Sequence, residues 1–493
     1  MRKKVIVVGG GIGGLTAGAL LAKDGFDVSV FEASNEWGGC AGKFQRGSFL
    51  FPVGATLGMG FEKGGVHERI LSTLNVSIQT KELDKVMAIH TPGRTIHYFR
   101  NREQYLAELK THFPNEINKI NAFYKEVWQI AERVRQLLDP LPVLPLTSAK
   151  DAVNLISSLP LSSWRLLPYL TQTMDGLLKK HKLEQAKEFV HLLDAQLIDS
   201  MQVTTKECAA VLACYALDIY HQGAFYVEGG LYRVAEELKD AVMRDGGKVY
   251  KRREVVHLER QHSKWHVTDK RGHIEEADHV VCNVPVQALS TLLREEDYQQ
   301  LSNRYKRKAN VPQWGTFTVY AAVNEKVVPN NMPVFQQVML TEDGSMSEGD
   351  HLFVSISAQH DCLRAPQGFR TLTASTHTDL SKWKTKEKYD RKNVELAEKM
   401  KQGLRTVLPQ LDEGLELWIT GGPRAWERFT KRPHGMVGGF GQSPAHSLFN
   451  SLSHRSGIDG LWLCGDSIFP GAGTIGVSVS GYHVYRSIVK QRG

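Results

Sequence analysis

The sequence predicts an α/β protein whose N-terminal domain is built around a parallel sheet. Three observations predict this fold class. A β-branched run, Val5 to Val8, precedes a glycine-rich turn, a second apolar run ends in the acid Glu32, and a third, near the C-terminus, leads into another glycine-rich loop. Unbroken apolar strands are typical of parallel sheets covered on both faces, and strands that alternate with helical segments favour βαβ units.

The first turn has the spacing of a phosphate-binding loop. Gly9, Gly11 and Gly14 form G-x-G-x-x-G between the first strand and a predicted helix. The first glycine permits a tight turn, the second lets the backbone approach a pyrophosphate, and the third lets the helix pack on the strand. Ile12 and Gly13 stand in the same turn, where backbone N–H groups at the helix N-terminus attract phosphate.

The second strand, residues 26–32, ends in a carboxylate. Glu32 follows Gly14 by 18 positions, which suits an acid that accepts hydrogen bonds from the ribose hydroxyls of adenosine. A 2′-phosphate would be repelled at this position. The combination predicts a Rossmann-type domain that binds a dinucleotide.

The residues after Glu32 are Ala33, and then Gly38, Gly39 and Cys40. Here the sequence resembles the two-dinucleotide-binding flavoproteins: amine oxidases, protoporphyrinogen oxidases and carotenoid desaturases. In those families a Gly-Gly pair lets the backbone pass close to FAD, whereas NAD dehydrogenases lack the pair. The resemblance implies that FAD is the cofactor and that these residues contact it. Lys43 is a further candidate contact, to the flavin or its phosphates.

The resemblance continues in the middle of the chain. The family's Y-P-x-G-G turn corresponds to residues 226–230, with Val227 in place of the usual proline. A predicted helix over 232–243 and a strand from 248 follow. The resemblance implies that the backbone of Val255 or Val256 contacts the adenine, and that residues 277–283 form the next buried strand.

The C-terminal segment carries the last pair of motifs. An apolar strand delivers Gly465 and Asp466, and a glycine-rich loop then leads into a helix. In the family the acid binds the ribityl or pyrophosphate region. Gly476 and Val477 correspond to a pair whose helix N–H groups face the flavin N1/O2 edge. Because reduced flavin carries negative charge there, a helix N-terminus would stabilise it.

Three stretches resemble the carotenoid desaturase and isomerase branch: Gly38-Gly39-Cys40, Phe469-Pro470-Gly471-x-Gly473, and the region 424–439. The resemblance implies an FAD-dependent oxidoreductase that desaturates a long apolar polyene. A hydride would pass to the flavin, and the neighbouring carbon would lose a proton. The branch's F-D-x-G is replaced here by Phe51-Pro52-Val53-Gly54. No catalytic residue and no metal site are assigned.

Three other functions stay open. The first is a carotenoid cis–trans isomerase that uses reduced FAD without net turnover. The second is an oxidase of the amine or porphyrinogen type. The third is a non-catalytic lipid-escort protein of the Rab GDP-dissociation-inhibitor type, which shares the fold without using flavin. The Gly465-Asp466 and Gly476-Val477 motifs argue against the third. The sequence does not specify the carotenoid, the bond, the electron acceptor or the oligomeric state.

These motifs predict a discontinuous FAD-binding domain with an inserted α+β substrate domain. The FAD-binding segments are residues 1–65, 226–290 and 424–493. The substrate domain is predicted as a helical part, 66–225, and a sheet part, 291–423. Within the sheet part, periodicity predicts strands and one amphipathic helix, at residues 316–323, 352–357 and 391–407.

The amino-acid composition limits the classes of partner that the protein is expected to bind. The 493 residues include 61 basic and 53 acidic ones, a net charge of +8, and the basic clusters are short and scattered. This pattern is typical of solvated surface charge rather than a nucleic-acid site, with attraction to an anionic membrane as the next reading. Six cysteines without a CxxC pair indicate reduced thiols in a cytoplasmic protein.

Membrane contact is predicted to be peripheral. No stretch approaches the ~18–20 apolar residues that a membrane-spanning helix needs. Residues 137–170 are rich in Leu, Pro and Trp, and Lys150 and Arg165 flank apolar residues there. This segment is either a helical cap over the core or an interfacial segment that dips into a bilayer. A carotenoid or related isoprenoid substrate would need such a docking surface on the cytoplasmic membrane face.

Overall fold

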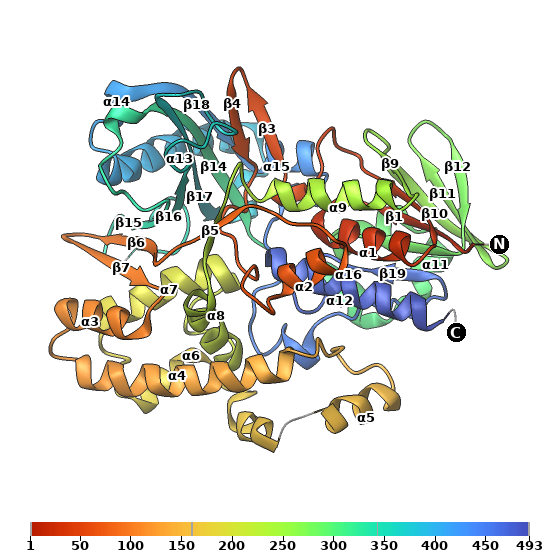
Figure 1. The fold of residues 1–493 in the computed structure, drawn as a ribbon, viewed down its shortest axis with the longest axis horizontal. Coiled ribbons are helices and arrows are strands. Elements are labelled where there is room, and N and C mark those ends of the chain that lie inside the picture. Colours follow the sequence, from red (N-terminus) through yellow and green to blue (C-terminus); the bar gives the residue numbers. More distant parts are fainter. Residues whose placement is uncertain (1, 159–160, 343, 492–493) are drawn as a thin grey trace.

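The computed structural model describes residues 2–158, 161–342 and 344–491. Its N-terminal strand lies at the centre of a five-stranded sheet in the order β19-β13-β1-β2-β9 (Figure 1). All neighbours in this sheet pair in parallel. The strands are β1 Lys4–Val8, β2 Asp27–Phe31, β9 Lys248–Tyr250, β13 His279–Cys282 and β19 Leu461–Leu463.

Both faces of this sheet are covered, which explains the unbroken apolar run in β1. Helices α1 (Ile12–Lys23), α9 (Tyr232–Arg244) and α16 (Gly473–Lys490) pack in one layer on one face. On the other face, Ile6 and Val8 belong to one apolar cluster with Trp265 from an antiparallel three-stranded sheet. That sheet consists of β10 Val255–Gln261, β11 Lys264–Asp269 and β12 Ile274–Ala277. The predicted Rossmann-type α/β fold is confirmed.

A second sheet has seven strands in the order β18-β14-β17-β16-β15-β6-β7. Two of these strands, β14 and β16, correspond to the predicted strands 316–323 and 352–357. Helix α13 (Lys386–Val407) corresponds to the predicted helix 391–407 and packs on one face of this sheet. The seven strands are β6 Lys85–Thr91, β7 Arg94–Phe99, β14 Gly315–Asn324, β15 Phe335–Met339, β16 His351–Ile356, β17 Phe369–Thr378 and β18 Leu415–Gly421.

The segment 66–225, predicted to be helical, also supplies β6 and β7. β6 pairs in parallel with β15, about 250 positions further along the chain. Because this pairing is long-range, the short apolar run Val86–Ile89 carries no local sign of it. The rest of the segment is mainly helical and packs around one apolar core. Its helices are α2 Val66–Thr73, α3 Arg102–His112, α4 Ile117–Leu138, α5 Ala149–Ser158, α6 Met174–Lys180, α7 Lys187–Met201, α8 Ala210–Gln222 and the 3₁₀ segment η2 Leu161–Tyr169.

A hairpin of β3 (Lys43–Arg46) and β4 (Phe49–Pro52) connects the two sheets. Phe51 packs edge-on against Tyr320 of β14, whose hydroxyl donates a 2.6 Å hydrogen bond to the carbonyl of Val53. Throughout the described ranges, every helix is too short or too polar to cross a bilayer. The remaining elements are β5 Thr80–Glu82, β8 Phe225–Val227, α10 Leu289–Leu292, α11 Glu295–Gln300, α12 Asn303–Ala309, α14 Leu411–Gly414 and α15 Pro423–Thr430.

Candidate active site

A cavity of about 2000 Å³ runs between the parallel sheet and the seven-stranded sheet. Residues from all three predicted FAD-binding segments line it, together with residues of α7, α8, β14, β16 and β17. Ligand pockets of roughly 300–1,000 Å³ hold drug-sized molecules. This cavity therefore has room for a dinucleotide and a second, extended molecule.

The phosphate loop forms one wall of the cavity. At Gly9, where φ is +100°, an added Cβ would lie 2.6 Å from the backbone carbonyl oxygen of Asn283. At Gly14, an added Cβ would lie 2.4 Å from the carbonyl oxygen of Gly9. Helix α1 begins after Gly11 with no side-chain cap, so the N–H groups of its first turn are available to an anion. Gly9, Gly11, Ile12 and Gly13 line the cavity, whereas Gly14 packs behind the loop.

Glu32 lies at the end of β2 and also lines the cavity, as does Ala33. Its carboxylate accepts 2.6 Å hydrogen bonds from the N–H groups of Gly10 and Ser34. Burial raises the pKa of Glu32, and these two backbone donors oppose the rise. The oriented carboxylate keeps further lone pairs for hydroxyl donors, so the residue suits the ribose of FAD.

The Gly38-Gly39 pair passes next to the phosphate loop. The Gly38 N–H donates a 2.8 Å hydrogen bond to the Gly10 carbonyl, and φ is +101° at Gly38 and +57° at Gly39. Cys40 follows and lines the cavity. Lys43 lines it too, but its ammonium group pairs with a carboxylate of α9 and lies 4.1 Å from the centre of an aromatic ring there.

The two adenine candidates begin β10. Val255 is buried, Val256 is 39% exposed, and both line the cavity. The pairing of β10 with β11 shifts register between Val255 and His257. Val256 is therefore the extra residue of a bulge and stands outside the ladder, which suits a residue that offers its backbone to a ligand.

A second helix N-terminus opens on the same cavity. Helix α16 begins after Ala472 without a side-chain cap, and residues 472–477, including Gly476 and Val477, line the cavity. An added Cβ at Gly481 would lie 2.1 Å from the Gly13 carbonyl, so the backbones of α16 and α1 touch. Two uncapped helix starts thus offer positive ends for two anionic regions, as FAD has in its pyrophosphate and its reduced flavin.

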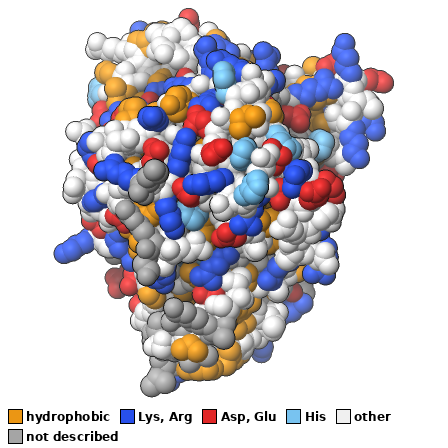
Figure 2. Space-filling model, turned by 90° about the vertical axis from the view of Figure 1, so that its right-hand side faces the viewer, with side chains coloured by type: hydrophobic (Ala, Val, Ile, Leu, Met, Phe, Trp, Pro, Cys, Tyr) orange, Lys and Arg blue, Asp and Glu red, His pale blue; other side chains and the backbone are white. Residues whose placement is uncertain are grey.

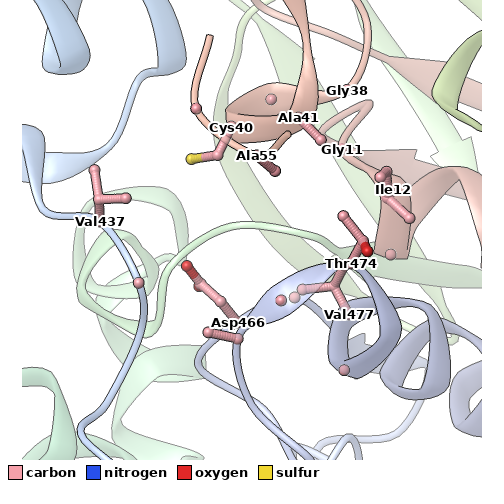
Figure 3. Close-up of a pocket in the computed structure, with 18 of the residues that line it drawn as sticks. Gly11, Ile12, Gly38, Cys40, Ala41, Ala55, Val437, Asp466, Thr474 and Val477 are labelled. Carbon is pink, nitrogen blue, oxygen red and sulfur yellow. The ribbon is translucent and has the colours of Figure 1, made fainter. Parts of the chain in front are cut away.

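Cys40 and Asp466 lie on opposite sides of one part of the cavity (Figure 3). The Arg432 guanidinium donates a 2.6 Å hydrogen bond to the Asp466 carboxylate and also interacts with the Cys40 thiol. Burial raises the pKa of the Cys40 thiol, although Arg432 opposes the rise. Asp466 raises the pKa of Arg432 against the effect of burial. Gly465, whose N–H donates to a serine hydroxyl of α16, lines the same region.

Polar residues outside the predicted site also line this cavity, among them Asn283, Asp199 and His377. Asn283 directly follows β13, and its side-chain amide donates a 3.3 Å hydrogen bond to the Gly9 carbonyl. Its place at the carboxyl end of a parallel strand was a usable signal, since ligands bind at that edge. Asp199 and His377 come from α7 and β17, and no local pattern links them.

A parallel sheet with a phosphate loop, a ribose-binding acid and a second helix start for the flavin defines an FAD-dependent oxidoreductase. The chain belongs to the family of flavin-containing amine oxidoreductases, whose model matches residues 12–486. FAD is thus the cofactor, and its contacts with the residues described above are our proposal.

Several known proteins are similar to this chain over nearly its whole length. A chloroplastic prolycopene isomerase 1 of an Oncidium hybrid is 26% identical over 97% of the chain and 82% of its own length. A 4,4′-diaponeurosporene oxygenase of Staphylococcus haemolyticus is 22% identical over 98% of this chain and 96% of its own length. Among solved structures, an oxidoreductase of Methanosarcina mazei superimposes with a TM-score of 0.63 at 16% identity, covering 99% of this chain and all of the other.

Proposed function

We propose that this flavoenzyme acts on a long apolar polyene of the carotenoid class and that its reaction is desaturation. The observation that carries the proposal is the second half of the cavity. Beyond the FAD motifs its walls are largely apolar and come from both the loop after β4 and the substrate domain, through Leu57, Met59, Leu212, Tyr215, Ile219 and Phe353. An apolar polyene would bury well against such walls, and relatives that span the chain are named for carotenoid substrates.

FAD supplies the electron acceptor when it is bound. The chain's own groups supply orientation and electrostatics. The uncapped start of α16 favours negative charge at the flavin, and the apolar walls hold the polyene and exclude water. Neither task requires a nucleophilic residue or a metal ligand.

Isomerisation is the second candidate. Four plant prolycopene isomerases match 97% of this chain at 25–26% identity. In an isomerase reduced FAD would act without net electron transfer, so the same cavity and the same cofactor contacts would serve. The two reactions differ in whether the oxidised flavin is consumed.

The test is anaerobic mixing of FAD-loaded protein with liposomes that contain acyclic carotenoids. Bleaching of the oxidised flavin band together with a product of longer conjugation is the expected result. A changed cis/trans pattern that requires pre-reduced flavin would establish isomerisation instead. If the flavin-containing protein changes no carotenoid under either condition, the substrate class is wrong. A colourless protein that FAD cannot reconstitute would favour an escort role.

Peripheral membrane binding is part of the proposal. In the segment 137–170, Val153, Trp164 and Leu167 are 64%, 53% and 54% exposed. The side chain of Lys150 and all of residues 159–160 lie outside the described residues. Figure 1 shows α5 at the edge of the molecule, and Figure 2 shows hydrophobic side chains gathered at this lower end of one face. Leu138, Leu141 and Pro142, which begin the segment, line the cavity, so a lipid-dissolved substrate could enter there.

Replacing Trp164 and Leu167 together by glutamate is expected to lower binding to anionic vesicles about tenfold or more, because two apolar side chains no longer enter the bilayer. Co-sedimentation with vesicles measures the change. Val394→Glu is the matched control, since Val394 is 69% exposed on α13, away from this segment. Equal vesicle binding by the double variant and the wild type would contradict the prediction.

On one face of the molecule, the surface charge is mixed in sign rather than gathered into a basic patch. On the face that carries β10 to β12, Lys and Arg side chains alternate with Asp, Glu and His (Figure 2). Several of them form ion pairs, such as Lys264 with Asp278 and Lys270 with Glu254. A nucleic-acid site would instead gather unpaired basic side chains on one surface.

A further inference from the structure

Asp199 is a carboxylate whose side chain is only 15% exposed, and among the described residues no Lys or Arg side chain forms an ion pair with it. It lies near the end of α7 and lines the cavity. The Gln337 amide donates a 2.6 Å hydrogen bond to its Oδ2, and His351 Nε2 lies 3.5 Å from the same oxygen. A buried carboxylate is costly without a permanent charge partner, and the structure supplies neutral groups around it. Such an arrangement is typical of sites where a proton is exchanged.

His377 stands beside this carboxylate from β17. Its Nε2 lies 3.0 Å from the side-chain oxygen of Gln202. An amide oxygen accepts hydrogen bonds but does not donate them, so Nε2 carries the hydrogen. Nδ1 then carries a lone pair, and among the described residues it has no hydrogen-bond partner. Trp314 packs edge-on against the ring at 5.8 Å and donates a hydrogen bond to the Gln202 carbonyl. The histidine is therefore held in one tautomer and one orientation.

This polar group adjoins the FAD half of the cavity through two consecutive glycines. An added Cβ at Gly438 would lie 2.3 Å from Oε1 of Gln202, and one at Gly439 would lie 2.5 Å from the Asp466 carbonyl. The backbone of residues 438–439 thus separates the Gln202–His377 pair from the proposed ribityl-binding acid.

We propose that Asp199 is the proton-transferring residue of the reaction, with Gln337, Gln202 and His377 as its positioning residues. This inference rests on the proposed function. In desaturation, bound FAD would accept a hydride from one carbon of the polyene, and the neighbouring carbon gives its proton to the Asp199 carboxylate. The electron pair of the second C–H bond becomes the new π bond. In isomerisation, a π electron pair of the polyene takes the proton of protonated Asp199 and forms a new C–H bond. The resulting carbocation rotates about the former double bond, and the proton then returns to the Asp199 carboxylate.

The ionisation of the group fits this task. Burial raises the pKa of Asp199 to about 6, while the attraction of His377 and the Gln337 hydrogen bond oppose the rise. Burial lowers the pKa of His377 to about 4 and that of His351 to about 3, so both are neutral where Asp199 titrates. Tyr220 of α8 also faces this carboxylate. Burial, and to a smaller extent the charge of Asp199, raises the pKa of the Tyr220 hydroxyl, so Tyr220 stays protonated. His191 of α7 acts on His351.

The test compares Asp199→Asn with wild type in anaerobic single turnovers on carotenoid liposomes, across pH 5 to 8. The base form exists above about pH 6, so the rate of desaturation should rise with pH through that value. An isomerisation that begins with protonation should fall instead. Asp199→Asn is expected to be slower by about 100- to 10,000-fold and to lose the inflection, whereas Asp199→Glu recovers part of the rate. FAD content and flavin absorbance should be unchanged.

Two further measurements keep a structural role distinguishable. Asp194→Asn is the matched control, because Asp194 is a half-buried carboxylate on the same helix that accepts the Thr205 N–H and does not line the cavity. It should keep the wild-type pH profile. Infrared titration of substrate-free protein should show a carboxylic-acid band that disappears through about pH 6 and is absent in Asp199→Asn.

The outcomes separate the two proposals. If wild type converts carotenoids and Asp199→Asn does so at the same rate with the same pH profile, the assignment of Asp199 is overturned while the proposed function stands. If loss of activity accompanies loss of FAD, or if Asp194→Asn loses the inflection as well, Asp199 is structural and the assignment is overturned. If wild type converts no polyene, the proposed function fails and the inference fails with it.

Discussion

Replacing Gly13 by valine is expected to give a folded protein that no longer retains FAD. An added Cβ at Gly13 would lie 2.9 Å from the Val477 carbonyl, 3.0 Å from the Asn283 side chain and 3.4 Å from the Gly465 nitrogen. Three motifs distant in sequence meet at this point. The extra volume must push the starts of α1 and α16 apart, and both are proposed to bind the anionic parts of FAD.

The measurement is the FAD content per chain after gel filtration, together with thermal unfolding at increasing FAD. A ligand that binds the native state raises its stability in proportion to RT ln(1 + [L]/Kd). Added FAD should therefore raise the unfolding temperature of the wild type and leave that of Gly13→Val unchanged. Gly176→Val is the control, because a Cβ at Gly176 in α6 meets no atom within 4 Å. Full FAD occupancy in Gly13→Val would show that the loop tolerates the side chain.

The dinucleotide-binding half of the fold could be predicted because its signals are local. The strand, the turn and the helix of the phosphate loop are adjacent in sequence. Its glycines stand where a side chain would clash, as at Gly14, which packs against the Gly9 carbonyl. The strands of the parallel sheet are buried on both faces and read as apolar runs. The partner of Lys43 could not be predicted from local sequence, because its ammonium group pairs with Glu236 of α9, 193 positions away.

The substrate half could be predicted only in outline, because its contacts are long-range. Asp199 and His377 are 178 positions apart, and one stands on a helix while the other stands on a strand. In sequence, Asp199 reads as a polar residue at the end of an apolar helix. Its chemistry depends on burial and on Gln337 from a third element. Motif recognition therefore yields the proposed cofactor contacts, whereas the groups proposed to act on substrate emerge only from the folded cavity.

Arg432→Met is expected to lower the free energy of unfolding by about 3–5 kcal/mol, because it leaves the Asp466 carboxylate buried without its partner. The side chains of Arg432 and Asp466 are 11% and 13% exposed and 2.6 Å apart. FAD occupancy should fall as well, since Asp466 is then free to rotate away from the cofactor. Denaturant unfolding of the FAD-loaded protein measures the first effect and flavin absorbance the second.

A double-mutant cycle separates the ion pair from general damage at this site. Adding Asp466→Leu to Arg432→Met removes the stranded charge, so the double variant should be more stable than the sum of the two single losses implies. The surface pair of Lys270 and Glu254, 3.3 Å apart with Lys270 68% exposed, is the control, and Lys270→Met should cost less than about 1 kcal/mol. If Arg432→Met costs no more than Lys270→Met, the guanidinium does not hold Asp466. The orientation of that acid toward FAD must then come from the backbone of the loop after β19, whose Gly465 N–H is already anchored to Ser480.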